Sequence, residues 1–283
     1  MAMSSGVVAA HSPPFKGGAA AQRPGWLVKG RVATLFLLEI TNHPVCAAEE
    51  RDLFIEAQPP LLEREGNVAQ KHMISLFKLP SREPLEEGAL LLRGFAEAEA
   101  QALIEEVERV ASTAPFRHLI TPGGYTMSVA MTNCGRVGWV SDRSGYRYDP
   151  LDPETGIRWP AMPGALLGLA QRAAAEAGFD KYDPDACLIN RYIAGSKLSL
   201  HQDRDEDDAW APIVSVSLGL PAVFLWGGKR RSDPVRRLPV ENGDVVVWGG
   251  PARFVYHGVA PLKDGRHPLT GATRLNLTFR KVF

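Results

Sequence analysis

Cysteine, net charge and long apolar runs are all scarce in this chain of 283 residues, and each scarcity excludes a class of protein. The three cysteines, Cys46, Cys134 and Cys187, fit no zinc-site spacing, and their odd number argues against a disulfide framework. We therefore expect a reducing, cytoplasmic location. The longest apolar run, residues 32–40, includes Glu39 and is far too short to cross a membrane as a helix.

The formal net charge is zero, because 32 lysines and arginines balance 32 acidic residues, and the pI is near 7.1. A protein without a global basic field must make any nucleic-acid contact through a local patch. The one concentrated basic stretch, residues 229–237, follows the turn at Gly227 and Gly228. It could bind phosphates, although a charged hairpin with no partner is the commoner meaning of such a run.

Residues 1–72 begin rich in Ala, Gly, Pro and Ser and show no clear periodicity later. We expect them to be a poorly ordered extension, or the product of a start codon placed too early, with Met73 as a natural beginning. The remaining residues, 73–283, can bury the core of one domain.

The most informative stretch is Leu198–Asp205, in which His201 and Asp203 stand two positions apart. Side chains two apart on an extended segment leave the same face, so this imidazole and this carboxylate could bind one metal ion. His257, in a short β-like run bounded by glycine, is the candidate third ligand. Two histidines and one carboxylate, with the other positions open, are typical of non-haem Fe(II) oxygenases. A surface loop can also contain His-x-Asp by chance.

A strict alternation near the end of the chain supports the metal interpretation. The apolar set is Leu275, Leu277 and Phe279, and the polar set is Arg274, Asn276, Thr278 and Arg280. The pattern predicts a half-buried strand over residues 273–280. Its two arginines lie roughly 20 Å apart along the backbone, so they could lean inward and bracket a small dicarboxylate. Two solvated arginines on an exposed face are the alternative.

Helical patterns come first in the chain and strand patterns follow. Residues 89–92 predict a short strand, 97–111 an amphipathic helix, and 163–178 a helix with proline at its start and glycine at its exit. Alternating segments then predict strands at 186–192, 213–218, 222–226, 244–248, 253–257 and 273–280. This order favours an α+β, mainly β fold, an antiparallel sandwich buttressed by helices.

The series His201-x-Asp203, His257, Arg274-x-Asn276 and Arg280 resembles the Fe(II)/2-oxoglutarate dioxygenases. Longer stretches resemble the bacterial AlkB family of DNA repair dioxygenases, namely residues 121–135, 185–192, 211–222 and 276–280. The similarity runs from about Met73 to Phe283. It implies a double-stranded β-helix, or jelly roll, buttressed by N-terminal helices, with a lid at 117–150, a core at 186–283 and iron at the open end.

The resemblance implies a reaction that needs Fe(II), 2-oxoglutarate and O2. His201, Asp203 and His257 would hold the iron and form the catalytic centre. Arg274 would pair with the distal carboxylate of 2-oxoglutarate, and Arg280 would lie near Asp203 and the 1-carboxylate. The other positions that match cosubstrate-binding residues are Asn190, Tyr192 and Asn276. Oxidation of an N-methyl group would release formaldehyde, succinate and CO2.

The implied substrate is alkylated DNA, with N1-methyladenine and N3-methylcytosine as the lesions and a preference for single strands, in which flipping a base costs less. Trp139 matches a lid position that stacks on the damaged base, and Tyr146 and Tyr148 match lid positions near the DNA backbone. Arg231 matches a phosphate contact. Asp205 would favour cationic lesions, although the acidic run that it begins is of a kind that is usually exposed.

Several alternatives remain open from the sequence. An RNA demethylase of the same family would accept the same flipped base. A 2-oxoglutarate oxygenase acting on protein would keep the iron and arginine residues but not the lid residues, and a binding module of jelly-roll type would have no reason to keep the metal triad. A core position is the alternative for Trp139. We expect a monomer without membrane contact.

Overall fold

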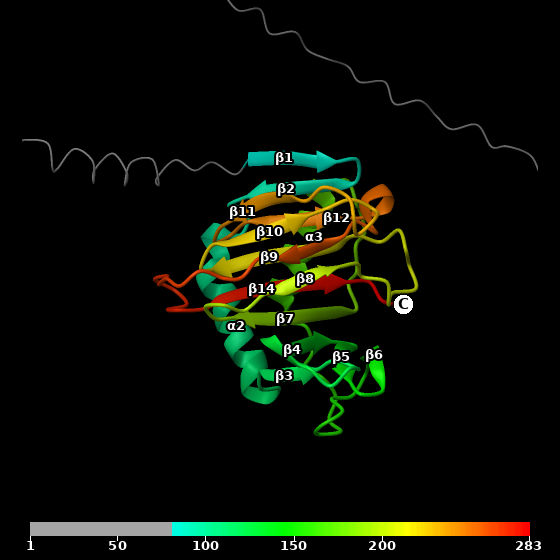
Figure 1. Cartoon of the computed structure of the whole chain (residues 1–283). Coiled ribbons are helices and arrows are strands. Elements are labelled where there is room, and N and C mark those ends of the chain that lie inside the picture. The colour runs from blue at the N-terminus through cyan, green and yellow to red at the C-terminus, as the bar shows by residue number, and fades with distance from the viewer. Residues whose placement is uncertain (1–80) are drawn as a thin grey trace, which may run out of the picture. The chain divides into compact units, whose positions relative to one another are not determined.

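The computed structural model describes residues 81–283, so the expectations for residues 1–72 and for a start at Met73 lie outside the described residues (Figure 1). The helices are α2 (Ala100–Thr113) and α3 (Gly164–Glu176), with the 3-10 turns η1 (Glu97–Glu99) and η2 (Gly250–Ala252). The strands are β1 (Ser81–Glu86), β2 (Ala89–Arg93), β3 (Arg117–Ile120), β4 (Thr126–Gly135), β5 (Gly138–Asp142), β6 (Gly145–Asp149), β7 (Ala186–Tyr192), β8 (Leu198–His201), β9 (Ile213–Gly219), β10 (Ala222–Trp226), β11 (Arg236–Val240), β12 (Val245–Trp248), β13 (His257–Val259) and β14 (Arg274–Arg280).

Two antiparallel sheets form the jelly roll that was predicted (Figure 1). The larger has the strand order β1-β2-β12-β9-β14-β7-β4-β3, and the smaller has the order β11-β10-β13-β8. Side chains between the sheets, among them Leu188, Phe224 and Trp248, form one apolar cluster. The separate β5–β6 hairpin lies beside β3 and β4.

The two predicted helices are confirmed, and both cover the outer face of the large sheet. Buried residues recur at helical spacing in α2, as at Leu103, Val107 and Val110, and they pack with β14 and β9 in a second apolar cluster. The helix α3 ends before Gly178, whose φ of 86° is a conformation that glycine adopts readily. Among the described residues, no helix has the length and apolar character needed to span a membrane.

Two expectations about strands are wrong. Residues 253–257 do not form a strand, because the 3-10 turn η2, with Pro251 inside it, precedes them and β13 begins only at His257. The strand β14 is buried on both faces and not on one, because helices α2 and α3 cover one face of the large sheet and the other faces the interior of the jelly roll. Its alternation is still as predicted: the apolar set packs toward the helices, and the polar set lines the interior of the jelly roll.

Candidate metal and cosubstrate site

The small sheet brings the two histidines of the predicted triad together. His201 at the end of β8 lies directly opposite His257 at the start of β13 in the antiparallel register. Their ring centroids are 4.4 Å apart. Asp203 follows two residues after β8, and the nitrogen and oxygen atoms that the three side chains offer all lie within 4.8 Å of one another. This donor set matches the chemistry of an Fe(II) site with open positions.

Backbone carbonyls orient both imidazoles. The Nδ1 atom of His201 lies 2.9 Å from the carbonyl oxygen of Ser199, and Nδ1 of His257 lies 3.1 Å from that of Val255. With Nδ1–H donating to these carbonyls, each ring presents Nε2 to the carboxylate of Asp203, at 3.6 Å and 3.8 Å. Such hydrogen bonds fix the tautomer that binds a metal.

Burial and charge shift the pKa values of two members of the triad, Asp203 and His257. Burial alone would raise the pKa of Asp203, but the guanidinium of Arg280, together with the two imidazoles, holds that pKa well below its usual range. Burial, with a further contribution from His201, lowers the pKa of His257 to about 3. A carboxylate and a neutral imidazole are the forms that bind a cation, and both are present at neutral pH.

The polar face of β14 opens into a cavity of about 870 Å³ that also contains the triad. Arg274 is 1 % exposed, and its Nη2 donates to Oγ of Ser217 at 3.1 Å. Its Nε and Nη1 have no hydrogen-bond partner among the described residues, and the same holds for the Tyr192 hydroxyl and for Oδ1 of Asn190. Buried donors of a charged group are normally paired. The donors among these groups, Nε and Nη1 of Arg274 and the hydroxyl of Tyr192, fit the distal carboxylate of 2-oxoglutarate.

The other end of β14 is tied to the triad. Nε and Nη2 of Arg280 donate to Oδ2 of Asp203 at 3.1 Å and 3.0 Å. Between the two arginines, the amide of Asn276 bonds to the protein itself: its Nδ2 donates to Oγ of Ser215 at 2.8 Å, and its Oδ1 accepts from Thr278 at 3.0 Å. Asn276 is thus part of the cavity wall.

Comparisons with known proteins agree with this geometry. The family model described as the 2OG-Fe(II) oxygenase superfamily matches residues 88–280. The chain is 61% identical over 203 residues to the alpha-ketoglutarate-dependent dioxygenase AlkB of Escherichia coli K12, covering 72% of this chain and 94% of that protein. The chain belongs to the AlkB family. A homologue from Caulobacter vibrioides is 47% identical over 67% of this chain and 85% of its own. The solved structure of OsALKBH1 aligns with a TM-score of 0.62 at 28% identity, covering 71% of this chain and all of that one.

Membership of the AlkB family makes this protein a dioxygenase dependent on 2-oxoglutarate, which is the same compound as alpha-ketoglutarate. Fe(II), 2-oxoglutarate and O2 are its cofactor and cosubstrates, and His201, Asp203 and His257 form a cluster that could hold a metal ion. The expected fold and enzyme class are therefore confirmed.

The β5–β6 hairpin covers the cavity of this AlkB-family enzyme. Trp139 stacks on Tyr146 with ring centroids 5.6 Å apart and 15° between the planes, and its Nε1 donates to Oδ2 of Asp205 at 3.2 Å. These three residues line the cavity together with Arg231. Tyr148 is not among the lining residues, because its hydroxyl donates to Glu206 at 2.6 Å. Trp139 is accordingly no core residue.

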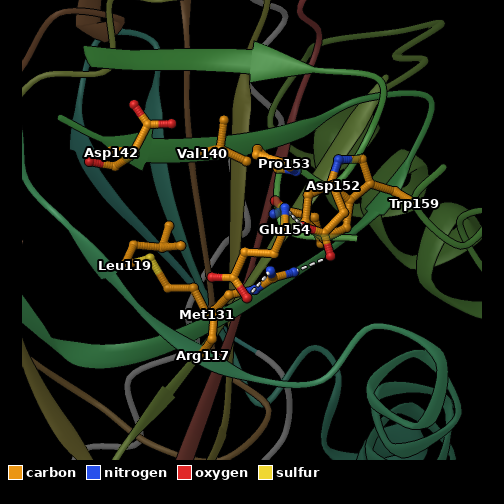
Figure 2. A pocket seen from close by; sticks show the side chains of 11 residues that line it. Arg117, Leu119, Met131, Val140, Asp142, Asp152, Pro153, Glu154 and Trp159 are labelled. Carbon is orange, nitrogen blue, oxygen red and sulfur yellow. Dashed lines mark hydrogen bonds and ion pairs between the residues drawn. The ribbon is translucent and has the colours of Figure 1, made fainter. Parts of the chain in front are cut away.

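A smaller cavity of about 240 Å³ lies between β3, β4 and β5 (Figure 2). Arg117 lies between two acids there, forming an ion pair with Asp152 and a second one of 2.8 Å with Glu154. Met131 lines both this cavity and the larger one. The two ion pairs connect β3 to the segment that follows the β5–β6 hairpin.

Sequence reasoning missed two buried charges beside the triad. The acidic run at residues 205–208 was expected to be exposed, but the Glu206 side chain is only 2% exposed. Arg253 is equally buried and lies in the stretch that was wrongly predicted to be a strand. Neither residue belongs to a motif, and their pairing across 47 positions has no signal in one sequence.

Proposed function

We propose that the protein is a demethylase that repairs N1-methyladenine and N3-methylcytosine in single-stranded DNA. The observation that supports this most directly is one cavity that contains the metal triad, the orphaned guanidinium of Arg274 and the aromatic pair of Trp139 and Tyr146. Such a cavity has room for a cosubstrate at its inner end and a planar base beneath the hairpin. A more distant relative from Arabidopsis, 33% identical, is named a DNA N(6)-methyladenine demethylase.

The chain's own residues would position both reactants. His201, Asp203 and His257 would hold Fe(II), which when bound supplies oxidation of the N-methyl group by O2, coupled to decarboxylation of 2-oxoglutarate. Arg274 would bind the distal carboxylate of 2-oxoglutarate with its free Nε and Nη1. Tyr192 would donate its unpaired hydroxyl to the same molecule, and Asn190, which lines the same cavity, would bind it through the Nδ2 amino group.

A flipped base would lie between the indole of Trp139 and the imidazole of His201, which line the same cavity. The methylated bases are cations, which an aromatic face attracts. Asp205, hydrogen-bonded to the indole, adds a negative charge at the place where the lesion's positive charge would lie. This charge favours methylated over normal bases.

Contacts with the DNA backbone would come from the rim of the cavity. Tyr146 is 50% exposed, and the guanidinium of Arg231 lies 5.1 Å from the ring centroid of Tyr256. Because the net charge is zero, we expect modest affinity that falls as salt rises. We also propose that the protein is a monomer and is located in the cytoplasm.

The test is mass spectrometry of a single-stranded oligonucleotide with one N1-methyladenine, incubated with the protein, Fe(II), 2-oxoglutarate and O2. We expect loss of one CH2 that requires every component and is abolished by His201→Ala. The matched control is His118→Ala, which removes an imidazole outside the cavity. An unchanged oligonucleotide with succinate still formed would refute the DNA substrate but not the oxygenase chemistry. An equal rate on the corresponding RNA would add RNA as a substrate.

A further inference from the structure

Glu206 is a buried acid in an acidic run, residues 205–208, whose other members are exposed. Its side chain is 2% exposed, whereas Asp205 and Asp207 on either side of it are exposed to solvent. Removing a carboxylate from water is costly unless it is paired and hydrogen-bonded. The burial of Glu206 therefore requires partners that compensate its charge.

Three side chains from distant segments bind the Glu206 carboxylate. Nη2 of Arg253 donates to Oε2 at 2.7 Å, and Nε of Arg280 lies 3.3 Å from Oε1. The hydroxyl of Tyr148 donates to Oε1 at 2.6 Å. The phenol thus completes the hydrogen bonding of a charge that two guanidinium groups already neutralise in part.

The same two arginines fix the metal ligand Asp203. Arg280 donates twice to its carboxylate, and Nη1 of Arg253 donates to its backbone oxygen at 2.9 Å. Asp203 and Glu206 supply two negative charges and the arginines two positive ones, so the buried group is neutral overall. Because each arginine contacts both acids, a shift of the Glu206 carboxylate would move both groups that orient Asp203.

Tyr148 connects this group to the hairpin above the cavity. It lies on β6 directly opposite Trp139 on β5, so the two side chains share one face of the hairpin. Trp139 donates to Asp205, and Tyr148 donates to the next residue, Glu206. The hairpin is therefore docked on two consecutive acids, of which the buried one also contacts the arginines that hold the metal ligand.

We propose that Glu206 is a positioning residue that couples docking of the β5–β6 hairpin to the orientation of the metal ligand Asp203. The inference depends on the proposed function only in treating the hairpin as a substrate lid. The coupling is reciprocal: a loaded metal site orders the hairpin, and a docked hairpin tightens the metal site by the same factor. Through the Glu206 carboxylate, binding of substrate under the hairpin and binding of metal by Asp203 would each affect the other.

Hydrogen exchange of the hairpin amides, residues 138–149, tests the coupling in the full-length protein. The probe is Mn(II) with 2-oxoglutarate, compared with the metal-free protein. In the wild type we expect loading to slow exchange by about fivefold or more. Glu206→Gln should abolish this difference and weaken Mn(II) binding by about tenfold, as for other groups that orient a ligand. Asp207→Asn, which removes an exposed charge from the same loop, should change neither quantity.

Tyr148→Phe keeps the inference testable if Glu206→Gln fails to fold. It removes a single hydroxyl, and we expect it to abolish the dependence of hairpin exchange on loading. A hairpin that loading still protects fully in Tyr148→Phe would overturn the inference, and so would a wild-type hairpin that does not respond to loading. Because the experiment contains no nucleic acid, a failure of the demethylation assay would leave its result unaffected.

Discussion

Replacing Arg274 by methionine is expected to act in opposite directions on the free protein and on its complex with 2-oxoglutarate. In the free protein the guanidinium is buried, donates to Ser217, lies 4.9 Å from the ring centroid of Tyr192, and is paired with no acid among the described residues. Burial lowers its pKa, which means that the charged form is held at a cost. Exchange of buried charged groups for apolar ones of similar volume is often neutral or stabilises by about 1–4 kcal/mol. The free variant should be at least as stable as the wild type.

In the complex the same change removes two hydrogen bonds to a carboxylate. Each charge-assisted bond contributes about 1.5–3 kcal/mol, so the loss is about 3–6 kcal/mol. Because each 1.4 kcal/mol corresponds to about tenfold in affinity, binding of 2-oxoglutarate should weaken by a factor on the order of 10² to 10⁴. Arg274→Lys keeps the positive charge but loses the planar guanidinium. Its affinity for 2-oxoglutarate should therefore lie between that of the wild type and that of Arg274→Met.

Thermal unfolding in the presence of Mn(II), with and without 2-oxoglutarate, measures both effects. At about 100 times its Kd the ligand should stabilise the wild type by about 2.7 kcal/mol and the variant hardly at all. Arg237→Met, at an exposed position on β11, is the control for loss of a positive charge. The reasoning would be refuted if Arg274→Met were clearly destabilised without ligand yet still stabilised by 2-oxoglutarate.

Three further predictions concern the triad and the nucleic-acid surface. In the metal-free protein His257 has a pKa of about 3, below its unfolded value, so the unfolded state binds more protons and stability falls as pH drops below 6.5. Protonation of His257 in the unfolded state should account for about 2 kcal/mol of the stability lost between pH 7 and 5. If the free energy of unfolding, measured by urea titration, had the same pH dependence in the wild type and in His257→Gln, this prediction would be contradicted. Trp139→Ala should weaken binding of a methylated single strand by about 1–3 kcal/mol, and Trp139→Phe should restore most of it in fluorescence anisotropy; equal affinity for all three would exclude stacking. Arg231→Ala should lower the slope of log K against log salt by about 0.7, whereas the exposed Arg237→Ala should not; an unchanged slope would remove Arg231 from the phosphate contacts.

The elements that could be predicted are those whose residues show a clear helical or two-residue period or a run of apolar side chains. The helix α2 shows its buried face at helical spacing, and β7 matches its predicted bounds, residues 186–192. By contrast, β4 mixes Thr, Ser, Met and Ala, and no strand was predicted there. The edge strand β11 is largely exposed and charged, so it lacks the alternation of a half-buried strand.

The residues of the candidate site likewise fall into those that the sequence could suggest and those that it could not. Spacing along the chain suggested the pair His201 and Asp203, a glycine-bounded run suggested His257, and the alternation at residues 273–280 suggested Arg274 and Arg280. What no spacing shows is the register that places His201 opposite His257. The burial of Glu206 was equally hidden, because its partners Arg253 and Arg280 come from segments that meet only in the folded protein.

The two arginines of β14 differ in a way that follows from their positions in the sheet. Both arginines are buried in the wall of the cavity, at 1% and 6% exposure, so each guanidinium needs a partner. Asp203 and Glu206 supply it for Arg280 and raise its pKa despite burial, whereas burial lowers the pKa of Arg274. The fold thus supplies counter-charges for Arg280, which lies beside the candidate metal ligand, and none among the described residues for Arg274, whose charge a bound anion would neutralise. Binding of 2-oxoglutarate should therefore stabilise the protein most at the end of β14 farthest from Asp203.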